Sequence, residues 1–121
     1  MWRVKLVEVL NSLEMKPARE DNSLYTNEDR TLFLHVHVDD GFLIGKSEDK
    51  ITSFLNMLNA RLKLKYQKRP IHHLGYHLNW LSKGTVQLIQ QDMIIYLLKD
   101  YDMENSQRFK TECNRNLLEE L

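Results

Sequence analysis

Two apolar stretches of the sequence flank a pair of adjacent carboxylates. Residues 31–38 are rich in β-branched and apolar side chains, and Phe42-Leu43-Ile44 follows them after Asp39-Asp40 and Gly41. Apolar runs of this length on either side of a short turn-forming segment are typical of a β-hairpin. We therefore expect a tight turn at this place, with Asp39 and Asp40 at the tip of the hairpin and Gly41 leading into the returning strand.

Apolar residues at helical spacing predict helices before and after this hairpin. Residues 2–14 form one such amphipathic segment, and residues 48–61 form a second. Ser47 is a suitable N-cap for the second helix, because serine is one of the residues preferred at this position. The two acidic residues that follow it lie in the first turn, where carboxylates interact favourably with the helix dipole. A third helix is predicted to begin at Gln91 or Asp92.

Alternating polar and apolar residues predict the remaining strands. Residues 24–26 could form a short strand. Residues 62–66 alternate apolar residues with polar ones, mostly lysine, which predicts a half-buried strand with a basic outer face. Residues 74–80 alternate again, and a turn at residues 82–84 leads into a partner strand that contains Val86. The resulting order predicts an α+β domain with its helices packed on one face of a mostly antiparallel sheet.

The charges are unevenly distributed along a chain that is neutral as a whole. The 121 residues hold 17 basic and 17 acidic side chains, a length that suits one domain. Residues 1–50 carry a formal charge of −3, residues 51–91 carry +6 with no carboxylate, and residues 92–121 carry −3. The basic segment is either a surface that attracts phosphate groups or a solvated basic face without a ligand.

Several classes of protein are excluded or disfavoured by the sequence. Cys113 is a single cysteine, so no disulfide can form within the chain. We find neither a signal peptide nor an apolar run that could span a membrane, and we expect an intracellular protein without a membrane partner. A hydrolase is unsupported, because the sequence has no Gly-x-Ser-x-Gly motif and no glycine-rich phosphate loop.

The adjacent carboxylates are the strongest candidates for chemistry. Asp39 and Asp40 could hold a divalent metal ion, since Mg²⁺ takes oxygen ligands and commonly only one or two protein carboxylates. In phosphoryl transfer such ions activate the attacking oxygen and stabilise the leaving one. A solvated turn without a ligand is the alternative interpretation.

Histidines and aromatic residues give weaker signals. His35 and His37 share one face of the predicted strand, either as metal ligands or as ordinary sheet residues, and no nearby cysteine or third histidine completes a zinc site. Tyr66, Tyr76 and Trp80 are interleaved with basic residues, as in a stacking surface for nucleic acid. The same alternation is typical of core residues.

Residues 33–45, with the sequence Phe-Leu-His-Val-His-Val-Asp-Asp-Gly-Phe-Leu-Ile-Gly, resemble the Tyr-Val-Asp-Asp hairpin of copia-type retrotransposon reverse transcriptases. The resemblance extends over nearly the whole chain, with its segments in the same order and at the same spacing. These further segments are residues 2–13, 21–25, 51–58, 73–78, 90–103 and 110–114.

The resemblance implies part of an RNA-directed DNA polymerase. The fold would be a partial polymerase palm, the ferredoxin-like half, over residues 1–89, leading into the start of the thumb and a tail over residues 90–121. Asp39 would be a metal-binding catalytic aspartate with Asp40 as its supporting neighbour, and Mg²⁺ or Mn²⁺ would be the cofactor. His37 occupies the position of the family's tyrosine, beside the primer end.

The resemblance also implies contacts with nucleic acid. An RNA or DNA template-primer and a dNTP would be the partners, with the upstream part of the polyprotein. Leu74, Gly75 and Tyr76 would lie near the primer strand. The basic residues of the middle segment would face nucleic acid or solvent; these are Arg61, Lys63, Lys65, Lys68 and Arg69.

The family brings another metal-binding aspartate from an earlier palm strand, upstream of the segment that begins at Trp2, and its fingers also lie upstream. We therefore expect an incomplete active site that does not polymerise DNA by itself. Two alternatives remain: a non-enzymatic nucleic-acid-binding domain, and a purely structural α+β domain derived from such an element.

Overall fold

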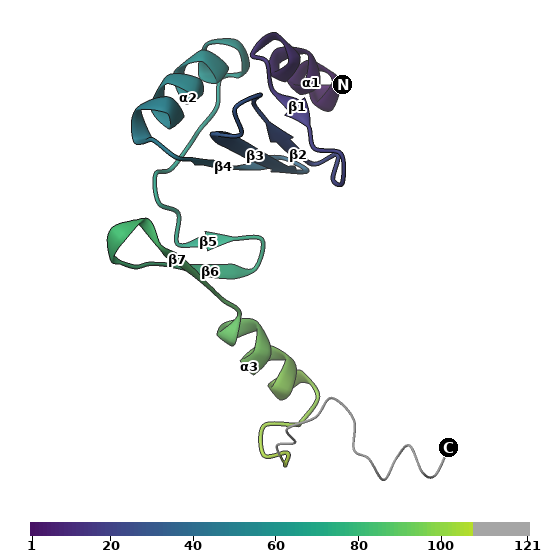
Figure 1. Cartoon of the computed structure of the whole chain (residues 1–121). Helices are drawn as coiled ribbons and strands as arrows, with labels where there is room; N and C mark the ends of the chain where they lie inside the picture. Colours follow the sequence, from purple (N-terminus) through teal and green to yellow (C-terminus); the bar gives the residue numbers. More distant parts are fainter. Residues whose placement is uncertain (108–121) are drawn as a thin grey trace. The chain divides into compact units, whose positions relative to one another are not determined.

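The structure, a computed structural model, describes residues 1–107 and divides into two compact units, which we describe separately. The first unit is Met1–Lys68, and the second begins at Arg69. The described residues form three α-helices, one short 3-10 helix and two antiparallel sheets. Figure 1 labels the α-helices and the strands. The α+β class predicted from the sequence is therefore confirmed, with the strands divided between two sheets.

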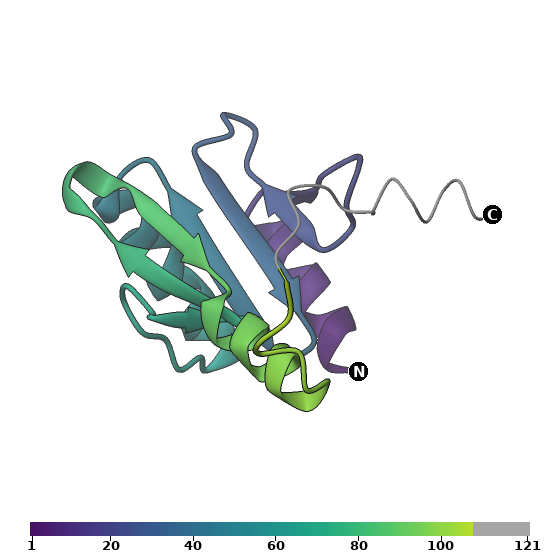
Figure 2. The same cartoon turned by 90° about the horizontal axis from the view of Figure 1, so that it is seen from below.

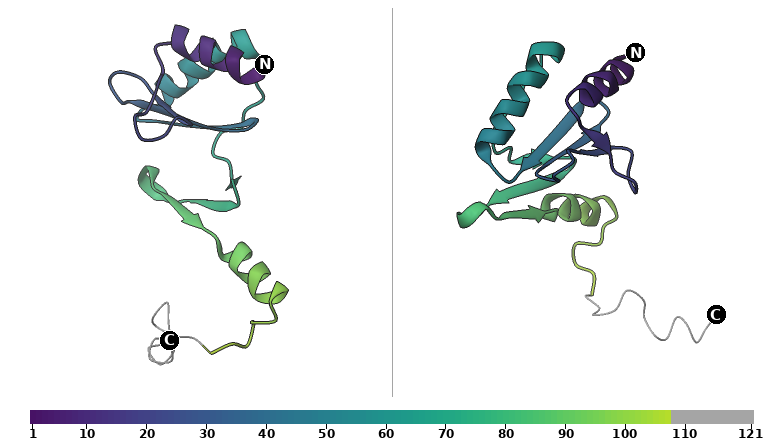
Figure 3. Two further views of the ribbon diagram at one scale, coloured as in Figure 1. Left: turned by 90° about the vertical axis from the view of Figure 1, so that its right-hand side faces the viewer. Right: turned by 45° about the horizontal axis from the view of Figure 1, so that its top comes forward.

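The first unit is a four-stranded antiparallel sheet covered on one face by two helices. The strand order is β1-β2-β3-β4, and α1 and α2 lie on the same side of the sheet in all views (Figures 1, 2 and 3). The elements of this unit are α1 (Trp2–Ser12), β1 (Lys16–Pro17), β2 (Leu24–Thr26), β3 (Leu32–His37), β4 (Asp40–Gly45) and α2 (Glu48–Leu62).

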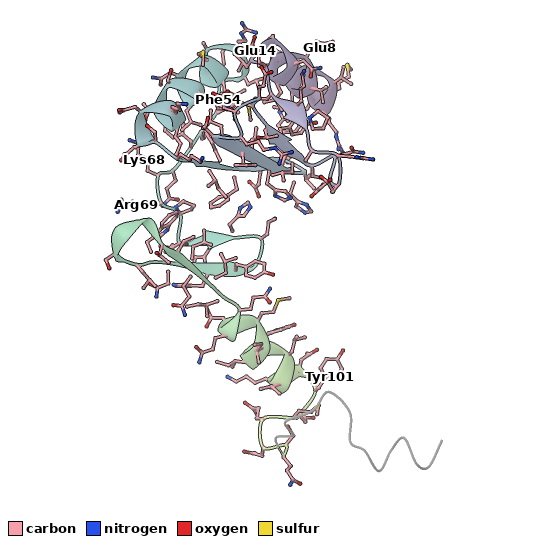
Figure 4. The ribbon with its side chains drawn as sticks, viewed as in Figure 1. Glu8, Glu14, Phe54, Lys68, Arg69 and Tyr101 are labelled. Atoms are coloured by element: carbon pink, nitrogen blue, oxygen red, sulfur yellow. The ribbon has the colours of Figure 1, made fainter. Side chains whose placement is uncertain are left out.

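The hydrophobic core of this unit lies between the two helices and the sheet. Leu10 and Met15 are fully buried, and Phe54 of α2 points toward the strands (Figure 4). Alternate residues of β3 face this core because successive strand side chains point to opposite faces of a sheet. The buried residues of the cluster are Leu6, Val9, Leu10, Met15, Tyr25, Leu32, Leu34, Phe54 and Leu58.

An asparagine side chain holds the loop between β2 and β3. Oδ1 of Asn27 accepts hydrogen bonds from the backbone amides of Thr31 and Leu32, each at 2.9 Å. Nδ2 of Asn27 donates to Oγ1 of Thr31 at 2.8 Å. The side chain thus pairs backbone groups that the turn would otherwise leave without partners, as asparagine commonly does in loops.

The second helix begins as predicted but ends differently. Oγ of Ser47 accepts a hydrogen bond from the backbone amide of Lys50, which confirms the N-cap. The strand predicted for residues 62–66 is wrong, because α2 continues to Leu62 and Lys63 then adopts a left-handed conformation. The side chain of Asn59 accepts from the backbone amide of Leu64 at 2.6 Å, so this amide is used at the helix end instead of in a sheet.

The leucines that suggested the strand are explained by packing on the first unit's core. Leu62 and Leu64 both pack against the core cluster, although neither lies in a strand. Tyr66 lies in the loop after α2 and is 50% exposed, so it is not a core residue. A short alternating pattern thus arises here from a helix end followed by a turn.

In the second unit the structure describes a three-stranded antiparallel sheet in the order β5-β6-β7, followed by helix α3. The indole Nε1 of Trp80 donates to the carbonyl oxygen of Pro70 at 2.8 Å, and Leu78 is buried. Helix α3 has no buried residue. The elements are β5 (His72–His73), β6 (Tyr76–Trp80), the 3-10 helix η1 (Ser82–Gly84), β7 (Val86–Ile89) and α3 (Gln91–Asp100).

The turn between β5 and β6 corrects the strand predicted for residues 74–80. Leu74 and Gly75 have φ values of 48° and 79°, so they form a two-residue turn, and the strand begins only at Tyr76. Positive φ at both central residues is the pattern of a type I′ turn, which matches the twist of the flanking strands. The partner strand after residues 82–84 and the helix start at Gln91 are both confirmed.

None of the helices in residues 1–107 has the length and apolar character needed to cross a membrane. Cys113 and the segment 110–114, which contributes to the resemblance, lie outside the described residues.

Candidate metal-binding hairpin

The two carboxylates lie where β3 turns into β4. His37 is paired with Asp40, so the turn consists only of Val38 and Asp39. The turn was expected to hold both aspartates and to lead through Gly41, but Asp40 is already the first residue of β4 and Gly41 pairs with Val36. The difference follows from the two-residue loop, which is the commonest hairpin connection.

Val38 is held in an unfavourable backbone conformation. Its φ is 51°, and it is the only β-branched residue among the described non-glycine residues with positive φ. Positive φ at the first central residue alone is the pattern of a type II′ turn, which prefers glycine there. Sequence reasoning missed this residue, and the signal that could have found it is the two-residue spacing between the strands. Strain of this kind clusters at functional sites.

The pairing of the strands places polar residues on the sheet face that the helices do not cover. Leu34 lies on the core face, so His35 and His37 share the opposite face, as predicted. Asp40 lies on that same face because it is directly opposite His37. Both aspartates are exposed, so their carboxylates are accessible to an ion from solvent.

The ligand chemistry of this hairpin fits a hard divalent cation in part. Asp39 and Asp40 offer carboxylate oxygens, the ligands that Mg²⁺ and Mn²⁺ prefer, and Mg²⁺ commonly takes only one or two of them from protein. Within residues 1–107 no group of three or more His, Cys, Asp or Glu side chains is placed to hold a metal ion. The hairpin therefore supplies part of a metal site.

Three predicted nucleic-acid contacts lie together in the second unit. Leu74 and Gly75 form the turn between β5 and β6, and Tyr76 is the first residue of β6, opposite His73. Leu74 is 42% exposed and Tyr76 is 38% exposed. Both side chains are therefore accessible at the end of this hairpin.

The predicted basic residues lie in the last turn of α2 and in the loop after it, and all are exposed. The guanidinium of Arg61 donates a hydrogen bond to the hydroxyl of Ser12, which links α2 to α1. Nζ of Lys68 lies 3.2 Å from a carboxylate oxygen of Glu48. In the part of the chain that the structure describes, no such partner is found for Lys63, Lys65 and Arg69.

Residues 1–114 match the model of the family described as Reverse transcriptase (RNA-dependent DNA polymerase). This chain belongs to that family. The reverse transcriptase match includes the Asp39–Asp40 hairpin and the β5–β6 hairpin. Reverse transcriptases act on a nucleic-acid template with dNTPs and generally use divalent metal ions. No solved structure matches the chain.

Proposed function

We propose that this chain provides the metal-binding hairpin in the palm of a copia-type retrotransposon reverse transcriptase. Asp39 is the metal-binding catalytic aspartate in this proposal, and Asp40 is its supporting neighbour. The observation that carries the proposal is an exposed pair of carboxylates at a two-residue turn, in a chain that matches the family over residues 1–114.

Asp39 and Asp40 would hold Mg²⁺ or Mn²⁺ through their carboxylate oxygens. When bound, such an ion activates the attacking oxygen in phosphoryl transfer and stabilises the leaving one. The short turn fixes the spacing of the two carboxylates, and His37 on the neighbouring strand lies beside them, where we propose that the primer end binds.

We propose that the site is completed by an aspartate from the upstream part of the polyprotein. The proposal rests on the absence of a three-residue metal-binding group in residues 1–107. With only two carboxylates on one hairpin, the ions that clamp the attacking and leaving oxygens would be incompletely held. We therefore propose that the chain alone does not polymerise DNA.

We further propose that residues 1–89 form the later part of the palm and that residues 90–121 begin the thumb. Leu74, Gly75 and Tyr76 would lie beside the primer strand, and the basic residues after α2 would contact the template-primer. The exposure of these residues supports the assignment, because a phosphate or a base can reach them from solvent.

Metal binding tests the site directly. Mn²⁺ binding to the full chain, followed by electron paramagnetic resonance, should weaken at least tenfold in Asp39→Asn and in Asp40→Asn. Asp29→Asn removes an exposed carboxylate from the loop before β3 and should leave binding unchanged. Equal affinities in all four proteins would refute the metal assignment.

Primer extension tests the activity. With an RNA template, a DNA primer, dNTPs and Mg²⁺ or Mn²⁺, the chain alone should add no nucleotides. Adding a polypeptide that carries the upstream palm strand and fingers should restore extension, and Asp39→Asn should abolish it. Extension by the chain alone that Asp39→Asn removes would show that the site is complete without other residues.

A second candidate function is nucleic-acid binding without catalysis. The observation that favours it is a run of exposed cationic side chains at and after the end of α2, Lys63, Lys65 and Arg69, for which residues 1–107 show no side-chain hydrogen bond or ion pair. A chain that binds RNA in a salt-dependent way but fails to restore extension in the mixed assay would support this function over the first.

A further inference from the structure

Two histidines face each other across the hairpin of the second unit. His72 of β5 is paired with His77 of β6, and the centres of their imidazole rings are 5.1 Å apart. The rings are nearly perpendicular, at 88°. This contact is separate from the Asp39–Asp40 hairpin, and no step of the proposed polymerase function uses it.

The backbone explains why the two rings are close. The two-residue turn makes His73 and Tyr76 the flanking pair of the hairpin, and the backbone amide of Leu78 donates to the carbonyl oxygen of Ile71 at 2.7 Å. His72 and His77 therefore lie opposite each other at a non-hydrogen-bonded position, between the hydrogen-bonded pairs His73–Tyr76 and Ile71–Leu78. Antiparallel strands bring side chains closest together at such a position.

Both imidazoles are available to a ligand. His72 is exposed and His77 is half-buried. Apart from their mutual contact, neither ring has a hydrogen bond or ion pair within the described residues. The neighbours of His77 on this face are uncharged: Ile89 lies opposite it on β7, and in the adjacent pair of this face Nδ2 of Asn79 donates to Oε1 of Gln87 at 3.2 Å.

We propose that His72 and His77 together bind a divalent transition-metal ion of the Zn²⁺ or Cu²⁺ class. An ion about 2 Å from one nitrogen of each ring, held at a tetrahedral angle, would place the ring centres roughly 5 Å apart. Their observed separation is 5.1 Å. Imidazole nitrogen suits Zn²⁺ and Cu²⁺, whereas Mg²⁺ prefers oxygen, so this site differs in selectivity from the aspartate hairpin.

The ion would be held by two protein ligands, with its other positions open. No third His, Cys, Asp or Glu joins the pair in residues 1–107, so water or another small ligand completes the coordination. Strand β5 has only two residues, and an ion bridging it to β6 would stabilise this short hairpin by mass action.

The test uses the full chain with Zn²⁺ or Cu²⁺ as the only added metal. Isothermal titration should give one Zn²⁺ site whose affinity falls at least tenfold in His72→Gln and in His77→Gln. The double variant should lose no more than either single variant, because a chelate needs both rings. Independent, additive losses or unchanged affinity would overturn the proposal.

Spectroscopy identifies the ligands independently of affinity. The electron paramagnetic resonance spectrum of bound Cu²⁺ should show hyperfine coupling to two imidazole nitrogens, and each single variant should lose that pattern. His37→Gln, which removes an exposed histidine from the other hairpin, should leave affinity and spectrum unchanged. An effect of His37→Gln as large as that of His77→Gln would place the ion elsewhere and refute the site.

Selectivity separates this proposal from the polymerase function. A large excess of Mg²⁺ should leave the Cu²⁺ spectrum unchanged, and Asp39→Asn should leave Zn²⁺ affinity unchanged. Displacement of Cu²⁺ by Mg²⁺ would contradict a nitrogen site. A far-UV circular dichroism spectrum that matches that of the unsubstituted chain confirms that each variant is folded. We expect this for His72→Gln in particular, because His72 is exposed.

Discussion

A Cβ atom at Gly45 would lie 2.7 Å from Cγ1 of Ile51 and 2.8 Å from Cδ2 of Leu32. Gly45 is the last residue of β4, and Ile51 lies near the start of α2. The end of the strand and the first turn of the helix are therefore in close contact. Leu32 is buried and Ile51 is packed against the core, so neither side chain can easily move aside.

Gly45→Ala should destabilise the first unit by about 1–3 kcal/mol, the usual cost of adding a methyl group to a packed core. Urea denaturation followed by circular dichroism measures the change. Gly41→Ala is the matched control in the same strand, because its Cβ would meet Leu34 only at 3.4 Å. A larger loss for Gly41→Ala than for Gly45→Ala would contradict the packing argument.

Val38→Gly should raise the free energy of unfolding by about 0.5–1 kcal/mol. Valine at a φ of 51° is strained, and the relief exceeds the entropy that glycine adds to the unfolded chain. Little burial is lost, because Val38 is 73% exposed. Val36→Gly, inside β3, should instead lower the free energy of unfolding. Thermal unfolding of the two variants shows whether each one is stabilised or destabilised.

Asn27→Ala should cost about 2–3 kcal/mol, because it leaves the backbone amides of Thr31 and Leu32 without their acceptor. Hydrogen exchange at those two amides should accelerate more than at the rest of β3. Asn22→Ala, an exposed substitution in the preceding loop, is the control and should change stability by less than about 0.5 kcal/mol. Equal losses for the two variants would argue against a structural role for Asn27.

Lys63→Gly should stabilise the end of α2 by up to about 1 kcal/mol. Lys63 adopts φ 48° and ψ 66°, a conformation in which glycine avoids the clash of Cβ. Lys65→Gly removes the same charge two residues later, where the φ is not positive, and should be neutral or slightly destabilising. Chemical denaturation checks the difference between the two variants.

Replacing Lys63, Lys65 and Arg69 together by Gln should weaken RNA binding and reduce its dependence on salt. Three lost phosphate contacts lower the slope of log K against log salt by about 2 for a single strand. Fluorescence anisotropy at several salt concentrations measures the slope. The control neutralises three exposed lysines of the first unit away from this segment, Lys5, Lys16 and Lys46, and an equal effect there would indicate non-specific attraction.

The helices and the central hairpin could be predicted because their signals are local. The first helix and the N-cap at Ser47 depend on apolar spacing and a capping side chain, and both are found in the structure, although the helix predicted for residues 2–14 ends at Ser12. The turn of the hairpin lies one residue earlier than predicted, at Val38 and Asp39 instead of Asp39 and Asp40. A hairpin's register is set by loop length, and a run such as Val38-Asp39-Asp40-Gly41 allows more than one loop.

The errors fall where tertiary contacts decide the conformation. Leu62 and Leu64 alternate like strand residues, yet they lie on either side of a left-handed residue and pack, half-buried, against the core of the first unit. Leu74 is apolar and follows the alternation, but it lies in a turn. Because the alternation places Leu74 in the strand, it does not predict that His72 and His77 lie opposite each other.

The two-residue connection between His37 and Asp40 limits how this part of the chain can vary in length. If the two-residue turn is kept, an added residue there would shift the register of β4 by one and exchange its inward and outward side chains. Leu43 would then leave the core, and Asp40 would leave the face that it shares with His37. The loop between α2 and β5 carries no such pairing. Insertions should therefore be accepted between residues 65 and 70 and rejected between the carboxylates and the strand that precedes them.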